Sequence, residues 1–439
     1  MKKNIIIIMV LILISILLEE VNSKAKVRIK TAERVYCISQ GGSGDFTGRD
    51  WLNTMSTLPE SLVRGATYYI SSGKYPSRIF DDPVKGDTYI SIKAATHYDH
   101  GPDLGWNNEF EGLLVFGPIL FTVPFYRMDG TKKKLIEVNG SFLGTVVSIK
   151  TNKIELSNCK IDGEFRKSLA GKHIQGACNG ITVSGSDVSI KECEIYDIAD
   201  DGVEIHNAKR LLFTGNTIRR LNGCGTDGGC GPCYNGHSDG LEIYNVSDSE
   251  ISYNFITDIK GNAALFFGNW GALCRNLKIY NNIFYSPDTG FAAYISDCDN
   301  VQFINNIVWG TEKGGYGGLA IGKRVRKLDI YNNIILSINY KHMGATYDKN
   351  NHKGGYNLFG KSLGQYYISN TDIINGEPMF NKIPGVKGKS IKDAEAKDFI
   401  LQNGSSAIDN GFMGNNTIKV PLYDFIGKKR IEKINIGAW

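Results

Sequence analysis

Apolar and polar residues alternate in short runs along most of this chain. Runs such as RNLKIYNN (275–282) and DNVQFINN (299–306) change character at every second residue and are separated by glycine, asparagine and aspartate. Alternation with a period of two predicts β-strands that bury one face, and turn residues of these types end such strands. The pattern excludes repeats built from helix pairs, whose apolar residues recur every three to four positions.

One short string recurs at the same point of each run and sets the period of the chain. Strings such as SYNFI, YNNIF and INNIV carry an asparagine or a cysteine at one aligned position. The aligned residues are Cys159, Cys193, Asn216, Asn254, Asn282, Asn306, Asn333 and Asn357. They follow one another about every 24 residues, apart from two long insertions. Repeats of this length predict the stacked coils of a parallel β-helix, with the asparagines turned inward and hydrogen-bonded from coil to coil.

The ends of the chain differ from the repeats and carry a family resemblance. YCISQGGSGDFTGRDWLNTM (36–55) and LVRGATYYISSGKY (62–75) precede the repeats, and DFILQNGSSAIDNG (398–411) and INIGAW (434–439) follow them. Together with the asparagine ladder, these segments resemble the pectate-lyase-like superfamily of secreted proteins over nearly all of the chain. The resemblance implies an all-β fold: a single-stranded right-handed parallel β-helix (solenoid) with an N-terminal cap and two long loop insertions.

The resemblance does not name a reaction. The superfamily includes polysaccharide lyases, glycoside hydrolases, epimerases, tailspikes and non-catalytic adhesins, and a shared fold alone carries no activity. Asp200 and Asp201 form a D-D pair, but the G-H-G of polygalacturonases does not follow it, and the R-x-P-x-x-R signature of pectate lyases is absent as well.

The first residues predict export. Two lysines precede an apolar run from Ile5 to Leu18, which is too short for a spanning helix and is typical of a cleaved signal peptide. We expect cleavage after Ser23, with an uncleaved N-terminal anchor as the alternative. The expected organisation is a signal peptide (1–23), a cap with the first coils (24–130), β-helix coils (131–375) and a terminal segment (376–439).

Charge adds little to this picture. The formal net charge of +5 permits an anionic polysaccharide as a partner but does not argue for one. No basic helical face or basic stripe with interleaved aromatic residues is present, so we expect no nucleic-acid partner. No segment after the signal peptide is apolar enough to span a bilayer. We therefore expect a secreted monomer that acts on a polysaccharide.

Two nearly identical stretches, ADDGVEIHN (199–207) and HSDGLEIYN (237–245), supply the candidate chemistry. The repeat register predicts that they form neighbouring rungs, with Val203, Ile205, Leu241 and Ile243 inside. One outward column then contains Thr182, Glu204, Glu242, Leu265, Ala293 and Ala320. The next contains Ser184, His206, Tyr244, Phe267, Ile295 and Gly322. Adjacent strands lie about 4.8 Å apart, so we expect Glu204 to stack near Glu242 and Asp201 near Asp239.

Stacked like charges point to a site. They are destabilising unless a proton, a donor or a cation lies between them, although outward acids at turns are also often simply solvated. We predict that Asp201, Asp239, Glu204 and Glu242 hold calcium or act in catalysis, with Asp239 and Glu242 the strongest candidates. Candidate bases or charge-neutralising groups are His206, His237, Lys260 and Arg220. Tyr244 is a further candidate base, and outward Tyr244 and Phe267 are expected to stack on sugar rings.

The insertions and cysteines complete the sequence picture. Both insertions (162–180 and 219–240) precede strands of the candidate site and should wall a groove beside it. Cys274 and Cys298 should lie on adjacent rungs, as should Cys159 and Cys193, either as disulfides or as buried free thiols. Cys178, Cys224, Cys230 and Cys233 in the insertions favour a loop disulfide over zinc, because their spacing is not that of a zinc site.

Three functions remain open. A polysaccharide lyase comes first, a glycoside hydrolase with paired Glu204 and Glu242 second, and a non-catalytic carbohydrate-binding surface protein third.

Overall fold

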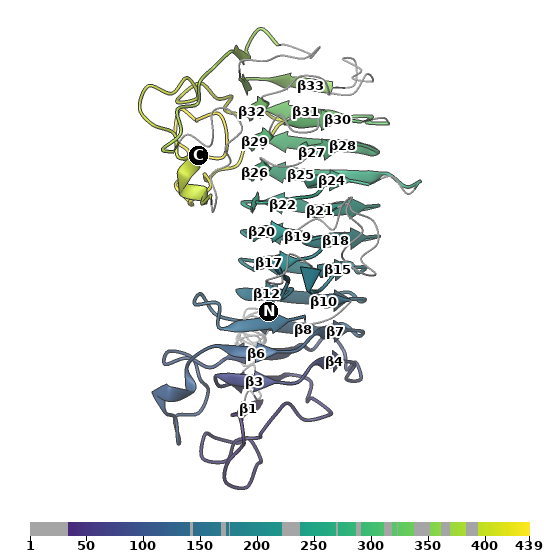
Figure 1. Cartoon of the computed structure of the whole chain (residues 1–439), viewed down its shortest axis with the longest axis vertical. Helices are drawn as coiled ribbons and strands as arrows, with labels where there is room; N and C mark the ends of the chain where they lie inside the picture. Colours follow the sequence, from purple (N-terminus) through teal and green to yellow (C-terminus); the bar gives the residue numbers. More distant parts are fainter. Residues whose placement is uncertain are drawn as a thin grey trace, which may run out of the picture. The chain divides into compact units, whose positions relative to one another are not determined.

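Three parallel β-sheets run side by side through the computed structural model, and the chain visits them in turn (Figure 1). The structure describes residues 34–140, 144–167, 173–174, 176–221, 238–268, 271–286, 291–310, 318–322, 324–337, 352–360, 369–382 and 394–439. The predicted signal peptide lies outside these residues. The account below concerns the unit Val35–Trp439.

Sheet 1 carries the strands that follow the two insertions. In spatial order it contains β4 (Arg78–Phe80), β7 (Ile119–Phe121), β10 (Thr145–Ile149), β15 (Asn179–Val183), β18 (Val203–His206), β21 (Asp239–Tyr244), β24 (Ala263–Phe267), β27 (Phe291–Ile295) and β30 (Leu319–Ile321).

Sheet 2 follows sheet 1 in each coil. It contains β1 (Arg34–Ile38), β2 (Ala66–Ile70), β5 (Ile90–Ala94), β8 (Tyr126–Asp129), β11 (Ile154–Ser157), β16 (Ser189–Lys191), β19 (Leu212–Thr214), β22 (Glu250–Ser252), β25 (Cys274–Tyr280), β28 (Cys298–Ile304), β31 (Leu328–Tyr331) and β33 (His352–Gly355).

Sheet 3 closes each coil. It contains β3 (Gly73–Tyr75), β6 (Leu114–Phe116), β9 (Ile136–Asn139), β12 (Cys159–Asp162), β17 (Glu194–Ile198), β20 (Thr217–Leu221), β23 (Phe255–Thr257), β26 (Ile283–Ser286), β29 (Ile307–Gly310), β32 (Ile334–Ser337), β34 (Leu358–Phe359) and β35 (Ile373–Ile374). The remaining elements are the antiparallel pair β13 (Arg166–Lys167) and β14 (His173–Ile174) and two 3₁₀ turns, η1 (Asn108–Phe110) and η2 (Ala396–Phe399).

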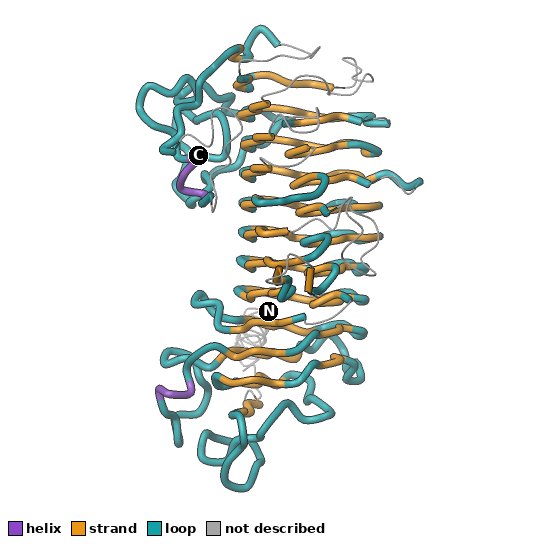
Figure 2. The backbone as a smooth tube through the Cα atoms, in the orientation of Figure 1, coloured by secondary structure: helices purple, strands orange, loops and turns teal. Residues whose placement is uncertain are grey.

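The predicted parallel β-helix is therefore confirmed. Loops of differing length join the strands of each coil (Figure 2), and every described pairing within the three sheets is parallel. The inward residues of the three sheets form one continuous apolar core. Val203, Ile205, Leu241 and Ile243 belong to it and are fully buried, as the alternation predicted.

The asparagine ladder lies at the corner between sheets 2 and 3. The Asn216 Nδ2 donates to Asn254 Oδ1 (3.1 Å), and the same bond links each later asparagine to the next, up to Asn333 and Asn357 (3.0 Å). Asn357 then donates to Asp372 (3.1 Å), which continues the ladder beyond the asparagines. Each acceptor oxygen also receives the backbone N–H of the preceding asparagine, as in the 2.9 Å bond from Asn306 N to Asn333 Oδ1. Buried amides are thus fully paired, which removes the cost of burying them.

Cysteines occupy the first two ladder positions. Cys159 and Cys193 are buried free thiols, and so are Cys274 and Cys298, which pair in register on β25 and β28 as predicted. Of the two alternatives for these pairs, the structure has the free thiols. Cys178 is disulfide-bonded, in keeping with a loop disulfide. Cys224, Cys230 and Cys233 lie outside the described residues.

A second apolar cluster lies on the outer face of sheet 3. Tyr285, Trp309 and Leu358 of this sheet pack against Phe399 and Trp439 of the C-terminal segment (394–439). Arg430 fastens that segment: its buried guanidinium donates to Asn281 Oδ1 and to the carbonyl of Ala438, both at 3.0 Å.

The ladder predicts a measurable stability cost. Asn306→Ala should lower the free energy of unfolding by about 2–5 kcal/mol, because it leaves the buried Asn282 donors without their acceptor. Urea denaturation followed by circular dichroism measures this change. Asn416→Ala, at an exposed asparagine, is the control and should change stability by less than about 0.5 kcal/mol. Equal effects of the two substitutions would contradict a structural role for the ladder.

Candidate functional site

The two D-G-x-E-I-x-N stretches form adjacent rungs of sheet 1. Glu204 pairs with Glu242, and His206 pairs with Tyr244, on β18 and β21. The predicted stacking is therefore confirmed. Its physical cause is the burial of Val203, Ile205, Leu241 and Ile243, which determines the residues of each strand that face outward. In the chain, the two insertions precede β15 and β21. Most of their residues (168–172, 175 and 222–237) lie outside the described residues, so the groove that they are expected to wall stays a prediction.

Three carboxylates meet in one cluster, which we call the acid triad: Asp201, Glu204 and Glu242. One oxygen from each lies within 4.8 Å of the other two. Asp201 and Glu242 are buried, and the Glu204 side chain is 24% exposed. Burial, together with repulsion from Asp200, Glu242 and Asp239, raises the pKa of Asp201 well above its ordinary value.

Asp239 lies beside the triad but is not a member of it. Its backbone N–H donates to Asp201 Oδ1 (2.8 Å), and its own carboxylate accepts from Asn262 Nδ2 (3.1 Å) on the next rung. Its side chain is fully buried. Asp239 therefore positions Asp201 and carries negative charge toward it.

Each glutamate of the triad has a polar neighbour two residues along its own strand. His206 Nε2 lies 2.7 Å from Glu204 Oε1, and this hydrogen bond raises the pKa of His206 above its ordinary value. The Tyr244 hydroxyl donates to Glu242. The rings of His206 and Tyr244 stack at 4.7 Å, nearly parallel. Gly268, on the rung above, is required here: a Cβ on it would lie 1.5 Å from the Tyr244 ring.

The outward column above Glu242 differs from the prediction. Glu242 pairs with Phe266, Phe266 with Tyr294, and Tyr294 with Ala320. Leu265, Phe267, Ala293 and Ile295 were expected outside but are fully buried, so the prediction of Phe267 as a sugar-stacking residue is wrong. The repeat alignments of NAALFFGN (262–269) and GFAAYISD (290–297) were each one residue out, and a one-residue slip moves every side chain to the other face.

The corrected column contains an aromatic stack that the sequence alignment missed. Phe266 and Tyr294 stack with ring centroids 5.1 Å apart and an interplanar angle of 20°. Both are partly exposed, one and two rungs beyond Glu242. Because NAALFFGN is apolar in both possible phases, its own sequence carried no signal that places Phe266 outside.

The remaining candidate residues are Arg220, Lys260 and His237. Arg220 is engaged elsewhere: it makes a bidentate ion pair with Asp197 (2.7 and 3.1 Å) and lies over the Tyr196 ring. Lys260 is exposed on the turn before β24, two residues from Asn262. His237 lies outside the described residues.

The acid triad suits a calcium ion. Calcium takes carboxylate oxygens at about 2.3–2.6 Å, so ligand atoms that share one ion lie at most about 5 Å apart. The triad meets this limit. Burial and the neighbouring acids raise the pKa of Asp201, and a bound cation would favour its ionised form. Asp201, Glu204 and Glu242 would hold the ion, with Asp239 outside the ligand set.

Comparisons with known proteins agree with the fold. Residues 145–335 match the family model described as the right handed beta helix region. Pectate lyase Pel9A aligns over 92% of this chain and 96% of its own, at 13% identity and a TM-score of 0.50. XylC, solved with xylose, aligns over 92% and 98%, at 11% identity and 0.45. A rhamnogalacturonan lyase aligns over 84% and 97%, at 13% identity and 0.44.

At these identities the similarity establishes a right-handed β-helix and nothing finer. No curated protein matches the sequence significantly. Among the described residues, no helix has the length and apolar character needed to cross a membrane.

The charge in the triad predicts a pH and metal response. Because the pKa of Asp201 is raised in the folded protein, the protonated carboxyl favours the folded state at low pH. This stabilisation is lost as the pH rises through the raised pKa. In chelator, Asp201→Asn should therefore melt higher than the wild type at pH 8, and the gain should shrink toward pH 5. Asparagine keeps the acceptor for the Asp239 N–H, so the backbone contact survives.

Calcium should stabilise the wild type but not the Asp201→Asn variant. At about 100 times its dissociation constant it should stabilise the wild type by about 2.7 kcal/mol but leave Asp201→Asn little changed. Differential scanning fluorimetry measures both effects. Asp329→Asn, at a buried acid outside the site whose pKa is also raised by burial, should respond to calcium as the wild type does. An equal calcium shift in Asp201→Asn would rule out the triad as the ion site.

Proposed function

We propose that this right-handed β-helix protein is an exported carbohydrate-active enzyme that cleaves a uronate-containing polysaccharide by β-elimination. The observation that carries the proposal is the acid triad, whose three oxygens lie within 4.8 Å on the outward face of sheet 1. A scaffold gains nothing from carboxylates stacked this closely, whereas a calcium site requires them. The similarity to a pectate lyase over nearly the whole chain is compatible with this chemistry.

β-Elimination divides the work among the residues of the site. Bound calcium would neutralise the uronate carboxylate and so make the neighbouring C5 proton more acidic. A base then removes that proton, the electron pair forms the C4–C5 double bond, and the glycosidic oxygen on C4 leaves and takes up a proton. Asp201, Glu204 and Glu242 hold the negative charge that recruits the ion, and Asp239 orients Asp201 through its backbone N–H.

Lys260 is the base that we propose. Its side chain is exposed on the turn before β24, and Asn262 of the same turn already reaches the Asp239 carboxylate. Tyr244 donates its proton to Glu242 and His206 is hydrogen-bonded to Glu204, so both are better suited to orient the glutamates than to accept a proton. The partly exposed Phe266–Tyr294 stack offers a platform for a sugar ring next to the triad.

Glycoside hydrolysis is the second candidate. The register sets Glu204 directly opposite Glu242, and their close carboxylates approach the separation of retaining hydrolases, about 5–5.5 Å. A hydrolase would need one of the two as a proton donor and the other as the nucleophile.

A digest separates these functions. Polygalacturonate, alginate, xylan and galactan are treated with mature protein in calcium or in chelator, and unsaturated-product absorbance is recorded together with reducing ends. We expect both signals to rise on a uronate polymer, in calcium only. An increase in reducing ends alone would indicate a hydrolase. The absence of both signals on every polymer would favour a binding protein.

Substitutions then assign the roles. At limiting calcium, Glu242→Gln should lower the rate at least about tenfold, and Lys260→Ala should lower kcat by about 10²–10⁴ at any calcium concentration. Two controls on sheet 2 should keep the wild-type rate: Glu155→Gln, in an exposed ion pair, and Lys278→Ala, at an exposed lysine. Full activity of Lys260→Ala would remove this residue from the mechanism.

The aromatic platform has its own test. Tyr294 lies two rungs from Glu242, so Tyr294→Ala should raise KM about two- to tenfold with little change in kcat, through the loss of one stacking contact. Steady-state kinetics on a soluble oligosaccharide would measure both constants. Tyr98→Ala, at an 88% exposed ring in the N-terminal region, is the control. An unchanged KM would show that substrate does not lie over this column.

A further inference from the structure

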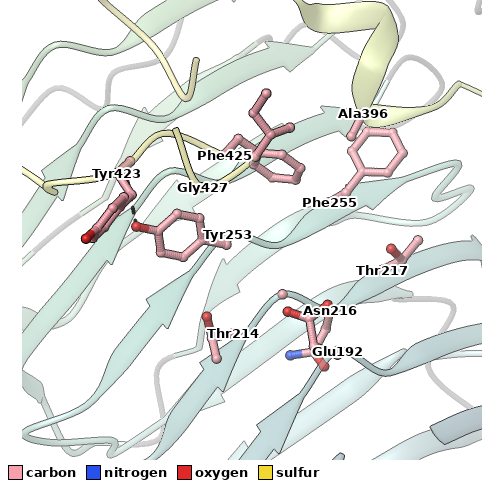
Figure 3. A pocket seen from close by; sticks show the side chains of 12 residues that line it. Glu192, Thr214, Asn216, Thr217, Tyr253, Phe255, Ala396, Tyr423, Phe425 and Gly427 are labelled. Carbon is pink, nitrogen blue, oxygen red and sulfur yellow. Dashed lines mark hydrogen bonds between the residues drawn. The ribbon is translucent and has the colours of Figure 1, made fainter. Parts of the chain in front are cut away.

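A cavity lies away from the acid triad, at the corner of the β-helix where the C-terminal segment meets the coils (Figure 3). Its volume is about 530 Å³, within the range of small-molecule sites. It is lined at the corner between sheets 2 and 3 by the turns that carry Asn216 and Tyr253. The C-terminal segment lines the rest of the cavity with Ala396, Tyr423, Phe425, Ile426 and Gly427.

One side of the cavity is polar. Glu192 lines it, and among the described residues the carboxylate of this side chain has no hydrogen bond or ion pair. A Cβ on Gly215 would lie 2.2 Å from Glu192 Oε1, so a glycine is required for the carboxylate to lie against this turn. Thr217 presents a hydroxyl that likewise makes no hydrogen bond within the described part of the chain. The Asn216 amide is committed to the ladder.

The other side is aromatic and firmly held. Tyr253, Phe255 and Phe425 line it, and Figure 3 shows them across from Glu192 and Thr214. The Tyr253 hydroxyl donates to the Tyr423 carbonyl (3.3 Å), and Phe255 packs edge-on against Phe399. Since Arg430 anchors the same segment, the aromatic wall is fixed before any ligand arrives.

We propose that this cavity binds one residue of a neutral saccharide. Aromatic rings pack against the apolar C–H face of a sugar, while a carboxylate accepts charge-assisted hydrogen bonds from two neighbouring hydroxyl groups. A threonine hydroxyl adds a donor and an acceptor. The negative charge of Glu192 repels the carboxylate of a uronate and so disfavours it, even though the positive charge of Lys134 offsets part of the Glu192 charge. A neutral sugar is therefore the class of ligand that can contact both the aromatic and the polar side of the cavity.

This site goes beyond the proposed cleavage and does not depend on it. The acid triad lies on sheet 1, whereas the cavity opens at the corner between sheets 2 and 3. The cavity would hold the protein on neutral regions of a polysaccharide while the triad acts on a uronate region.

Calorimetric titration of the full mature chain tests the proposal. The probes are β-1,4-linked galacto-, xylo- and gluco-tetraose, with tetragalacturonate as the charged counterpart, all titrated into the Glu242→Gln protein in chelator. We expect at least one neutral tetraose to bind with one site per chain. Adding Glu192→Gln should weaken it about tenfold, the effect of losing a charge-assisted hydrogen bond, and Thr217→Val about three- to tenfold.

Control variants make the outcomes decisive. Glu155→Gln should leave binding unchanged, and melting temperatures of all variants show that each is folded. The proposal is overturned if no neutral tetraose binds, if Glu192→Gln and Thr217→Val both bind as the parent does, or if tetragalacturonate binds here more tightly than the neutral sugars. Because the parent lacks an intact triad, neutral-sugar binding survives even if the cleavage proposal fails.

Discussion

The buried amide ladder is the interaction on which the rest of the molecule depends. Each asparagine from Asn216 to Asn333 donates to the next one along the ladder, so one corner has the same position and phase in all the coils from Asn216 to Asn357. A slipped coil would leave several buried amides without partners, and that penalty exceeds the net gain from any single correct bond. Alternation then determines which side of each strand faces outward. The ladder at one corner thereby sets the outward columns of sheet 1, including the pairing of Glu204 with Glu242.

The acid triad, unlike the asparagine ladder, destabilises the folded state. It brings together carboxylates whose mutual repulsion and burial raise the pKa of Asp201, so the folded chain tolerates a locally unfavourable arrangement. The surrounding contacts hold it in place: Asn179 donates to Glu204, Asn262 to Asp239 and Tyr244 to Glu242. A rigid solenoid can maintain such a cluster because the neighbouring rungs are stabilised independently. Local strain of this kind is typical of functional sites.

The repeat made the coil architecture predictable from sequence, because a period-two pattern and a recurrent polar corner have few physical solutions. The pairing of Glu204 with Glu242 followed from two almost identical strings. The pairing of Phe266 with Glu242 did not, because NAALFFGN is apolar at nearly every position and its alternation gives no phase. Burial of Phe267 is decided by the shape of the core, which only the three-dimensional structure contains. The cavity beside the C-terminal segment could not be predicted from the sequence either, since it joins Glu192 to Phe425 across more than half of the chain.

The return of the C-terminal segment along sheet 3 affects how the molecule is made. Tyr285, Trp309 and Leu358 emerge from the ribosome long before Phe399 and Trp439, which cover them. Until then the nascent coils present a row of aromatic and aliphatic side chains to water, although their own ladder and interior are complete. Before the C-terminal segment is added, the folded coils therefore expose an apolar surface that favours aggregation.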